Sequence, residues 1–446
     1  MGHRIGPPVI GVLGHYGNAN LGDEAIIHAV IEEIRRRWER ADLYAISNRP
    51  GDTAWRHLVP AVSIHTGELL EAGEGAPHVP RVSISPGTGR KAGPVGLWRL
   101  PALRMARRGA ARIVHAVAWI GAEALSAWRS FRQVRRFDLL LIAGSNQMLD
   151  NFGGAWEFPY INLKWSILAR LAGCRVAWIS VGAGPLDSPL GRRFVRAAMR
   201  LADYVSVRDE GSRRLLRDIG VKREIAICPD LAHGLVHDQG RAAGWDRGGG
   251  RPIVAINPMP VYDARYWFES SPEKSRRYLT EVAAFAAALL KDGYGVFFLA
   301  THPMDATVAE DILGVMEAEH GQRPWDRDPV RSPTTVPQLL REMESADLIV
   351  ATRFHGAVLS LRVERPVLAI CYYRKTRELL ADFGQGPDFA VTLEEFRAED
   401  GLDRLRLLEA RAQALIPIMR QKSADCRAAL REQYDRVFEL VAGRDA

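Results

Sequence analysis

Short apolar segments of strand length alternate with segments of helical periodicity along most of the chain. A strand predicted over residues 8–13 is followed by a turn and by a helix over 23–40, in which apolar residues recur every three or four positions. Such alternation predicts parallel sheets that are covered by helices on both faces. The sequence predicts further strands at 42–47, 137–143, 175–181, 204–207, 224–228, 253–257, 295–300, 348–351 and 367–370.

A glycine-rich segment divides this alternation into two halves. Residues 237–251 contain five glycines and almost no aliphatic side chains, which is typical of a linker. With 446 residues the chain is long enough for two cores. We therefore predict an α/β protein with two Rossmann-like, doubly wound domains facing a cleft, over residues 1–236 and 252–401, and a helical segment at 402–446.

One insertion in the first predicted domain, at about residues 65–136, departs from the alternation. Residues 81–136 hold twelve Lys and Arg against one acid, a net charge of +11 compared with +7 for the whole chain. Three tryptophans also occur there, together with an apolar stretch at 113–120. One interpretation is a basic amphipathic helix on an anionic membrane surface. The other is a solvated helical insertion packed on the first domain.

The positive net charge favours anionic partners, such as phosphorylated metabolites or lipid phosphates. Nucleic acid is not an expected partner, because the excess charge is confined to one segment and aromatics do not alternate with cations as in RNA-binding sheets. The cysteines lie far apart, at positions 174, 228, 371 and 426, which predicts free thiols. We therefore expect no metal and no cofactor.

No run of apolar residues reaches the roughly 18 to 20 that a membrane-spanning helix requires. The apolar stretch at 9–13 is too short for a signal peptide and leads directly into a glycine-rich loop. These observations predict a cytoplasmic protein. The basic insertion leaves open a peripheral position on the cytoplasmic face of the membrane.

Glycine and small polar residues follow three predicted strands of the first domain. Ligands of doubly wound sheets bind beyond the carboxyl ends of the strands, so these loops are candidate binding loops. The alternative for Asn20 or Asp23 is a helix cap. The candidate residues are Gly17, Asn20, Gly22 and Asp23 in the first loop, Gly144 and Asn146 in the second, and Gly182 and Gly184 in the third.

Cations and histidines follow other predicted strands. Arg208 follows the strand 204–207, and its planar guanidinium suits a carboxylate or a phosphate. The alternative is a surface ion pair with a neighbouring acid. Arg353 and His355 stand at the start of a helix after the strand 348–351, where a protein can hold an anion and move a proton. A structural histidine is the alternative for His355.

Three more candidates lie near the same edge of the second predicted sheet. Arg374 and Lys375 follow the strand 367–370 and add two cations. His302 follows the strand 295–300 and, like the nearby Asp305, fits a site and a structural role equally well.

Taken together, these motifs resemble the polysaccharide pyruvyltransferase family. The resemblance is carried by Gly-Asn-Ala-Asn-Leu-Gly-Asp at 17–23, Ser-Val-Gly-Ala-Gly-Pro at 180–185, Ser-Val-Arg-Asp at 206–209 with Ser212, and the segments 346–356 and 366–372. It covers most of the chain except residues 65–136 and the last forty. The resemblance implies two Rossmann-like domains in the glycosyltransferase-B arrangement.

The resemblance also implies a reaction. Members of the family transfer a pyruvyl group from phosphoenolpyruvate to two hydroxyls of a sugar, which gives a cyclic ketal and phosphate. Their acceptors are saccharides of cell envelopes and exopolysaccharides, typically lipid-linked or polymer-bound. The donor contacts of the family match Arg208, Arg353 and His355 here, and Arg374 and Lys375 are further candidate donor contacts.

This chemistry requires a general acid for the donor methylene and a base for the acceptor hydroxyl. We predict His355 as the acid and Asp23 as the base. The loop glycines, Asn20, Asn146 and His302 are predicted to contact the acceptor or the phosphate.

Two other functions fit parts of the sequence. A glycosyltransferase-B enzyme that uses a nucleotide sugar needs an acid in the second domain for the ribose hydroxyls, and Glu378 lies in a suitable region but without the usual donor loop. The other is a non-catalytic module of a polysaccharide assembly complex. The presence of the candidate donor contacts argues against this second function, namely Arg208, Arg353 and His355.

Overall fold

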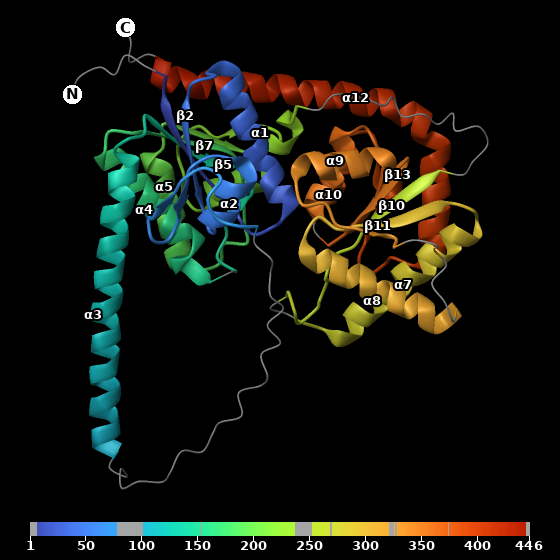
Figure 1. The fold of residues 1–446 in the computed structure, drawn as a ribbon, viewed down its shortest axis with the longest axis horizontal. Helices are drawn as coiled ribbons and strands as arrows, with labels where there is room; N and C mark the ends of the chain where they lie inside the picture. The colour runs from blue at the N-terminus through green and yellow to red at the C-terminus, as the bar shows by residue number, and fades with distance from the viewer. Residues whose placement is uncertain are drawn as a thin grey trace.

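The structure is a computed structural model, and the residues that it describes form two parallel sheets flanked by helices (Figure 1). The described residues are 7–77, 101–151, 153–236, 252–267, 270–320, 325, 328–372 and 374–442, and within 101–117 and at 320 only the backbone is described. The predicted linker at 237–251 and residues 81–100 of the basic insertion lie outside the described residues.

The first sheet has the strand order β4-β3-β2-β1-β5-β7-β8-β9, with β6 paired to β7. All of its pairs are parallel except β3 with β4. Its strands are β1 (Val9–Leu13), β2 (Asp42–Ser47), β3 (Ala61–Ser63), β4 (Leu69–Leu70), β5 (Leu139–Ala143), β6 (Asn146–Met148), β7 (Arg175–Ala183), β8 (Tyr204–Val207) and β9 (Ala226–Ile227).

Helices follow the strands of this sheet, as expected where buried parallel strands need cover on both faces. They are α1 (Leu21–Arg37), α2 (Pro50–His57), α3 (Pro101–Val134), α4 (Phe158–Leu171), α5 (Pro189–Leu201) and α6 (Glu210–Asp218), with 3-10 turns η1 (Gly154–Trp156) and η2 (Leu231–Gly234). The predicted helical insertion is present as α3, a helix of 34 residues.

The second sheet is parallel throughout, in the order β12-β11-β10-β13-β14-β15. Its strands are β10 (Ile253–Asn257), β11 (Gly295–Leu299), β12 (Val330–Arg331), β13 (Leu348–Ala351), β14 (Val367–Cys371) and β15 (Ala390–Thr392). The helices around it are α7 (Pro272–Lys291), α8 (Pro303–His320), α9 (Val336–Ser345), α10 (Phe354–Arg362) and α11 (Arg374–Asp382), with the 3-10 turn η3 (Pro387–Phe389). The predicted α/β class with two Rossmann-like layers is confirmed.

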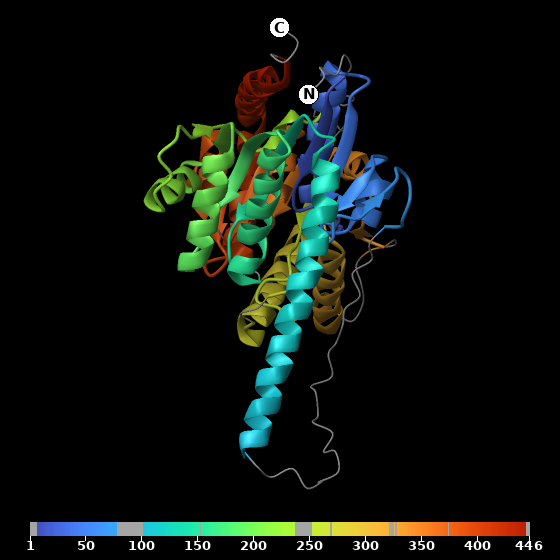
Figure 2. The same cartoon turned by 90° about the vertical axis from the view of Figure 1, so that its left-hand side faces the viewer.

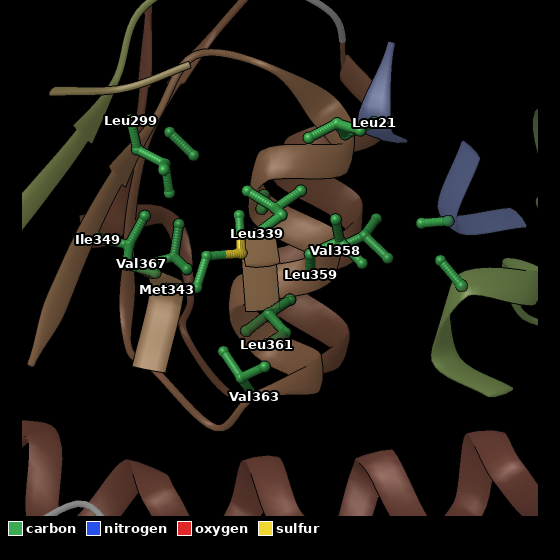
Figure 3. Packing of buried hydrophobic residues seen from close by; sticks show 14 of the residues in the cluster. Leu21, Leu299, Leu339, Met343, Ile349, Val358, Leu359, Leu361, Val363 and Val367 are labelled. Atoms are coloured by element: carbon green, nitrogen blue, oxygen red, sulfur yellow. The ribbon is translucent and has the colours of Figure 1, made fainter. Parts of the chain in front are cut away.

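The two halves share one hydrophobic cluster. Leu21, at the start of α1, lies beside Leu339 of α9 and Val358 of α10, which belong to the second half (Figure 3). The backbone N–H of Leu21 also donates a hydrogen bond to the carbonyl of Thr301, at 2.8 Å. The start of α1 is therefore fixed against the second half, close to the loops that follow its strands.

The last helix, α12 (Ala398–Ala442), contacts both halves (Figure 1). It changes direction along its length, and Pro417 within it supplies a physical reason, because proline removes a helical hydrogen bond. Near its end, Phe438 packs edge-on against Trp38 of α1 with 4.7 Å between ring centroids. Gln433 forms hydrogen bonds with Ser180 and Ser206 of the first sheet.

Within the described part of the chain, no helix combines the length and the apolar character that crossing a bilayer demands.

The contact of Phe438 with the first half yields a prediction. Phe438 is buried and its ring packs on Trp38 and Tyr434, so Phe438→Ala should cost about 3 to 5 kcal/mol of local stability. We expect the end of α12 to detach, which limited proteolysis and hydrogen exchange of residues 430–442 would detect. Arg436→Ala, an exposed change nearby on the same helix, is the control and should leave the protection unchanged.

Candidate functional site

His355 lies directly over the start of α1. It belongs to the first turn of α10, just after strand β13. A Cβ atom added to Gly22 would lie 2.4 Å from the Cβ of His355 and 2.7 Å from its Nδ1. Gly22 is therefore required here for close approach, because any side chain would displace the imidazole. This contact joins two predicted site residues from opposite halves of the molecule.

Asp23 is held next to this contact by two hydrogen bonds. Its carboxylate accepts from Asn20 Nδ2 at 2.7 Å and from Ser145 Oγ at 2.9 Å. Asn20 also caps α1, because its side-chain oxygen accepts from the N–H of Gly22. The capping interpretation of Asn20 is therefore correct, and the cap at the same time orients Asp23.

The glycine loop before α1 is shaped by a buried carboxylate. Glu24 accepts a hydrogen bond from the N–H of Gly17 at 2.8 Å, and its other oxygen lies 2.8 Å from Nε2 of His57. Gly17 has φ of +81°, and an added Cβ would lie 2.7 Å from the carbonyl oxygen of Arg49. Glycine is therefore required at position 17 by the backbone conformation of the turn and by its close approach to Arg49.

Arg208 lies across the end of the neighbouring strand β7. An added Cβ on Gly182 would lie 2.9 Å from Nη2 of Arg208 and 2.7 Å from Oδ1 of Asn146. Nη1 of Arg208 donates to Oδ2 of Asp230 at 2.9 Å. Its Nε is buried and makes no hydrogen bond to any described residue. A buried donor without a partner is uncommon in proteins and is a candidate contact for a ligand.

Asp230, just before η2, joins Arg208 to His355. Its Oδ2 lies 3.6 Å from Nε2 of His355, in addition to its hydrogen bond from Arg208. Burial alone would raise the pKa of Asp230, but His355 and Arg208 hold this pKa well below its usual value. Asp230 is therefore a carboxylate at neutral pH. Nε2 of His355 is buried and makes no hydrogen bond within the described part of the chain.

Lys375 adds a cation whose charge is sensitive to pH. Burial, together with the nearby Arg208, lowers its pKa to about 7. Both cations contact the ring of Phe354, with Nζ of Lys375 at 5.2 Å and Cζ of Arg208 at 4.8 Å from its centroid. Phe354 thus holds together two positive groups that would otherwise repel each other.

A cavity of about 550 Å³ opens beside these residues. Its walls include Arg208, Asp230, Phe354 and Lys375, and its far end is lined by residues of α11 and α12. A second cavity, of about 400 Å³, is lined by Asn146, Gly184, Arg374, Lys375 and Glu378 among others. Five predicted site residues therefore line these two cavities: Asn146, Gly184, Arg208, Arg374 and Lys375.

Arg353 belongs to a different group of side chains. It forms a buried ion pair with Asp305, in which its Nε lies 2.8 Å from both carboxylate oxygens. Its guanidinium also lies over the ring of Tyr266, which in turn contacts the ring of His302. Arg353 is thus neutralised within the protein, whereas the charge of Asp230 is shared by Arg208 and His355.

The remaining predicted residues have local roles in the structure. Gly144 has φ of +51° and packs against Ile26, where an added Cβ would lie 2.6 Å away. Asn146 donates to the carbonyl of Gly184 at 2.7 Å. Arg374 is exposed and forms an ion pair with Glu378 at 2.8 Å.

Asp230 and Asp305 each contact predicted site residues. The sequence did not single out Asp230, whereas Asp305, like His302, fitted a site and a structural role equally well. The sequence places each of them at the start of a helical turn, which is the ordinary position of a helix cap. Only the fold shows that Asp230 also faces two predicted site residues.

The pKa of Lys375 yields a prediction for anion binding. Between about pH 6 and pH 8 this side chain passes from mostly protonated to mostly neutral, because its pKa is about 7. Sulfate, which keeps its charge over this range, should therefore bind about tenfold more weakly at pH 8 when measured by calorimetry. Lys375→Gln should bind weakly at both pH values, while Lys291→Gln, an exposed change, should resemble the unmodified protein. Parallel pH profiles for Lys375→Gln and the unmodified protein would refute this role.

Solved structures with a similar fold support the architecture. A putative UDP-N-acetylglucosamine 2-epimerase from Listeria monocytogenes is 8% identical, with a TM-score of 0.52 over 97% of this chain and 98% of that chain. The trehalose 6-phosphate synthase of Burkholderia multivorans is 12% identical, with a TM-score of 0.51 over 99% of this chain and 100% of that chain. The fold is therefore that of glycosyltransferase-B enzymes and related epimerases.

In sequence, no curated protein matches the chain. The family model of polysaccharide pyruvyl transferases, however, matches residues 20–373. This range includes every predicted loop residue except Gly17, and it includes Arg208, Arg353 and His355 but neither Arg374 nor Lys375. This match covers most of the chain and both sheets. The chain therefore belongs to the polysaccharide pyruvyl transferase family.

Proposed function

We propose that the protein transfers the pyruvyl group of phosphoenolpyruvate to two hydroxyls of a saccharide, which forms a pyruvate ketal and releases phosphate. The observation that carries this proposal is the meeting of Arg208, Lys375 and His355 around Asp230 beside a cavity of about 550 Å³. Family membership gives the reaction class, and these side chains fit the donor and the proton transfer that the reaction needs.

The donor carries a carboxylate and a phosphate, so it requires more than one cation. Arg208 is suited to one of these groups, because its buried Nε has no hydrogen-bond partner among the described residues. Lys375 lies near the same Phe354 ring, with its Nζ 5.2 Å from the ring centroid, and carries a charge below about pH 7. A bound anion would raise the pKa of Lys375 and so favour its charged form.

His355 is the residue that we assign to the first proton transfer. A proton from its Nε2 passes to the methylene carbon of the donor, which leaves C2 electrophilic. An acceptor hydroxyl then forms a bond to C2, the C2–O bond to phosphate breaks, and a second hydroxyl closes the ketal. Of the two hydroxyl protons, one restores His355 and the other leaves with phosphate. The carboxylate of Asp230 lies 3.6 Å from this Nε2.

The acceptor needs groups that bind and deprotonate hydroxyls. Asp23 is the candidate base, since Asn20 and Ser145 fix its carboxylate next to the contact of Gly22 with His355. The cavity walls also carry Asp209, Glu210 and Glu378, which are suitable acceptors for the hydroxyls of a sugar. The cavity is large enough for a sugar beside the small donor, which supports a saccharide acceptor.

The donor decides between this proposal and a glycosyltransferase with the same fold. The full-length protein should be stabilised against heating by phosphoenolpyruvate and should release phosphate from it in the presence of a suitable saccharide. We expect no comparable stabilisation by nucleotide sugars. If a nucleotide sugar raises the melting temperature and phosphoenolpyruvate does not, the protein is a glycosyltransferase.

The assignment of His355 predicts a separation of binding from turnover. His355→Gln keeps a polar side chain of similar size but cannot deliver a proton, so phosphate release should fall on the order of a hundredfold or more. Donor affinity, measured by calorimetry, should change only a few-fold because Arg208 and Lys375 remain. Near-normal turnover in this variant would show that His355 is structural.

The contact of Gly22 with His355 predicts an unusual pair of variants. Gly22→Ala places a methyl group where the imidazole lies, so activity should fall at least tenfold although alanine favours the helix. Gly314→Ala is the matched control, because Gly314 is also helical and an added Cβ there meets no atom within 4 Å. The control should keep full activity. Equal activity of the two variants would remove His355 from the site.

A further inference from the structure

Helix α3 stands largely apart from the rest of the molecule. Its N-terminal part extends beyond the other described helices and strands in Figure 1, and it projects in the same way in the second view (Figure 2). Its C-terminal part is fixed to α4, where Glu123 accepts from Tyr160 at 2.8 Å and lies 3.0 Å from Lys164. A long helix is therefore anchored near its C-terminal end, while its backbone extends away from the two sheets.

The anchored part of α3 buries two serines and Val134 against the protein and leaves larger apolar side chains exposed. Ser126 and Ser130 are buried, and Ser126 donates a hydrogen bond to the carbonyl of His65. On the other faces, Ile120, Leu125 and Trp128 are 59%, 47% and 54% exposed. This is the reverse of an ordinary amphipathic helix, which buries its apolar stripe. We call these three residues the apolar face of α3.

Cations lie beside this apolar face. Arg132, Arg135 and Arg136 are exposed at the end of α3 and just after it, and Cζ of Arg132 lies 5.0 Å from the ring centroid of Trp128. Trp119 of α3 is also exposed, and its ring packs edge-on against the exposed Trp156 with 5.8 Å between ring centroids. Exposed tryptophans together with arginines are typical of helices that lie at the boundary between lipid headgroups and acyl chains.

We propose that α3 binds an anionic lipid surface, with its apolar face at the acyl boundary and the neighbouring arginines on lipid phosphates. Binding there would hold the enzyme at the membrane, where it could meet a lipid-linked acceptor. Meeting the acceptor rests on the proposed function, whereas lipid binding does not. The charge of the surrounding sequence supports lipid, because residues 81–136 carry a net charge of +11.

A second copy of this chain fits the apolar face less well. Pairing two copies of α3 would bring arginines against arginines, and the only acid of residues 81–136, Glu123, is already occupied by Lys164 and Tyr160. Like charges at such an interface cost affinity. An anionic bilayer supplies both the apolar layer and the opposite charge.

Sedimentation of the full-length protein with vesicles tests the proposal. The protein should bind vesicles of phosphatidylcholine mixed with phosphatidylglycerol, should lose binding as salt rises, and should not bind vesicles of phosphatidylcholine alone. The triple variant Arg132→Gln, Arg135→Gln, Arg136→Gln should bind more than tenfold more weakly, because each cation near an anionic leaflet strengthens binding roughly fivefold. Its control removes three exposed cations of the second half, at Arg276, Arg341 and Lys291, and should bind normally.

A second triple variant, Ile120→Ser, Leu125→Ser, Trp128→Ser, should also lose vesicle binding, whereas Ile418→Ser on α12 should not. All of these variants should keep phosphoenolpyruvate affinity, since no changed residue lines the cavity at Arg208 and Lys375. This readout separates the lipid proposal from the proposed function. Failure to bind anionic vesicles at low salt would overturn the lipid proposal. The lipid proposal would also be overturned if the unmodified protein forms oligomers in the absence of lipid and the serine variant does not, as measured by light scattering.

Discussion

The carboxylate of Asp230 holds the site together, because it lies against both Arg208 and His355 and carries the charge opposite to that of Arg208. Arg208 follows strand β8 of the first sheet, whereas His355 opens α10 beside the second sheet. A buried carboxylate is costly unless opposite charges and hydrogen bonds offset its lost hydration, and here they come from both halves. Because its two partners follow strands of different sheets, Asp230 links the geometry of the site to the packing of the two halves.

Close backbone approach is the second constraint. Gly22 allows the imidazole of His355 to rest on the start of α1, and Gly182 allows the guanidinium of Arg208 to rest on the end of β7. Both glycines place a functional side chain against backbone that a Cβ atom would block. Arg353 and Asp305 form a separate buried ion pair next to the loop at Thr301, which itself contacts Leu21. The start of α1 is thus flanked by two charged groups. Among the described residues, Nε of Arg208 and Nε2 of His355 in the first group, and Nη2 of Arg353 in the second, are buried without a hydrogen bond.

The sequence predicted the longer strands closely, because most of their residues are apolar and buried between the flanking helices. β2, β8, β10 and β13 have the predicted bounds. The missed strands, β3, β4, β6, β12 and β15, have two or three residues each, and pairing with a neighbour defines them rather than any periodic pattern. In the candidate site, residues that follow strands could be predicted, and Arg208, His355 and Lys375 do lie together. Asp230 could not, because its partnership with His355 spans 125 positions and its local sequence also suits a cap.

Transfer of a proton to the methylene carbon of phosphoenolpyruvate is the central chemical step of this account, and isotope labelling tests it directly. The full-length protein is incubated in D₂O with phosphoenolpyruvate and a panel of lipid-linked and soluble saccharides, and the product is analysed by mass spectrometry and NMR. The account predicts a ketal whose methyl group carries one deuterium, formed together with phosphate. A product without a pyruvyl group, or a ketal whose methyl group contains no deuterium from solvent, would contradict it.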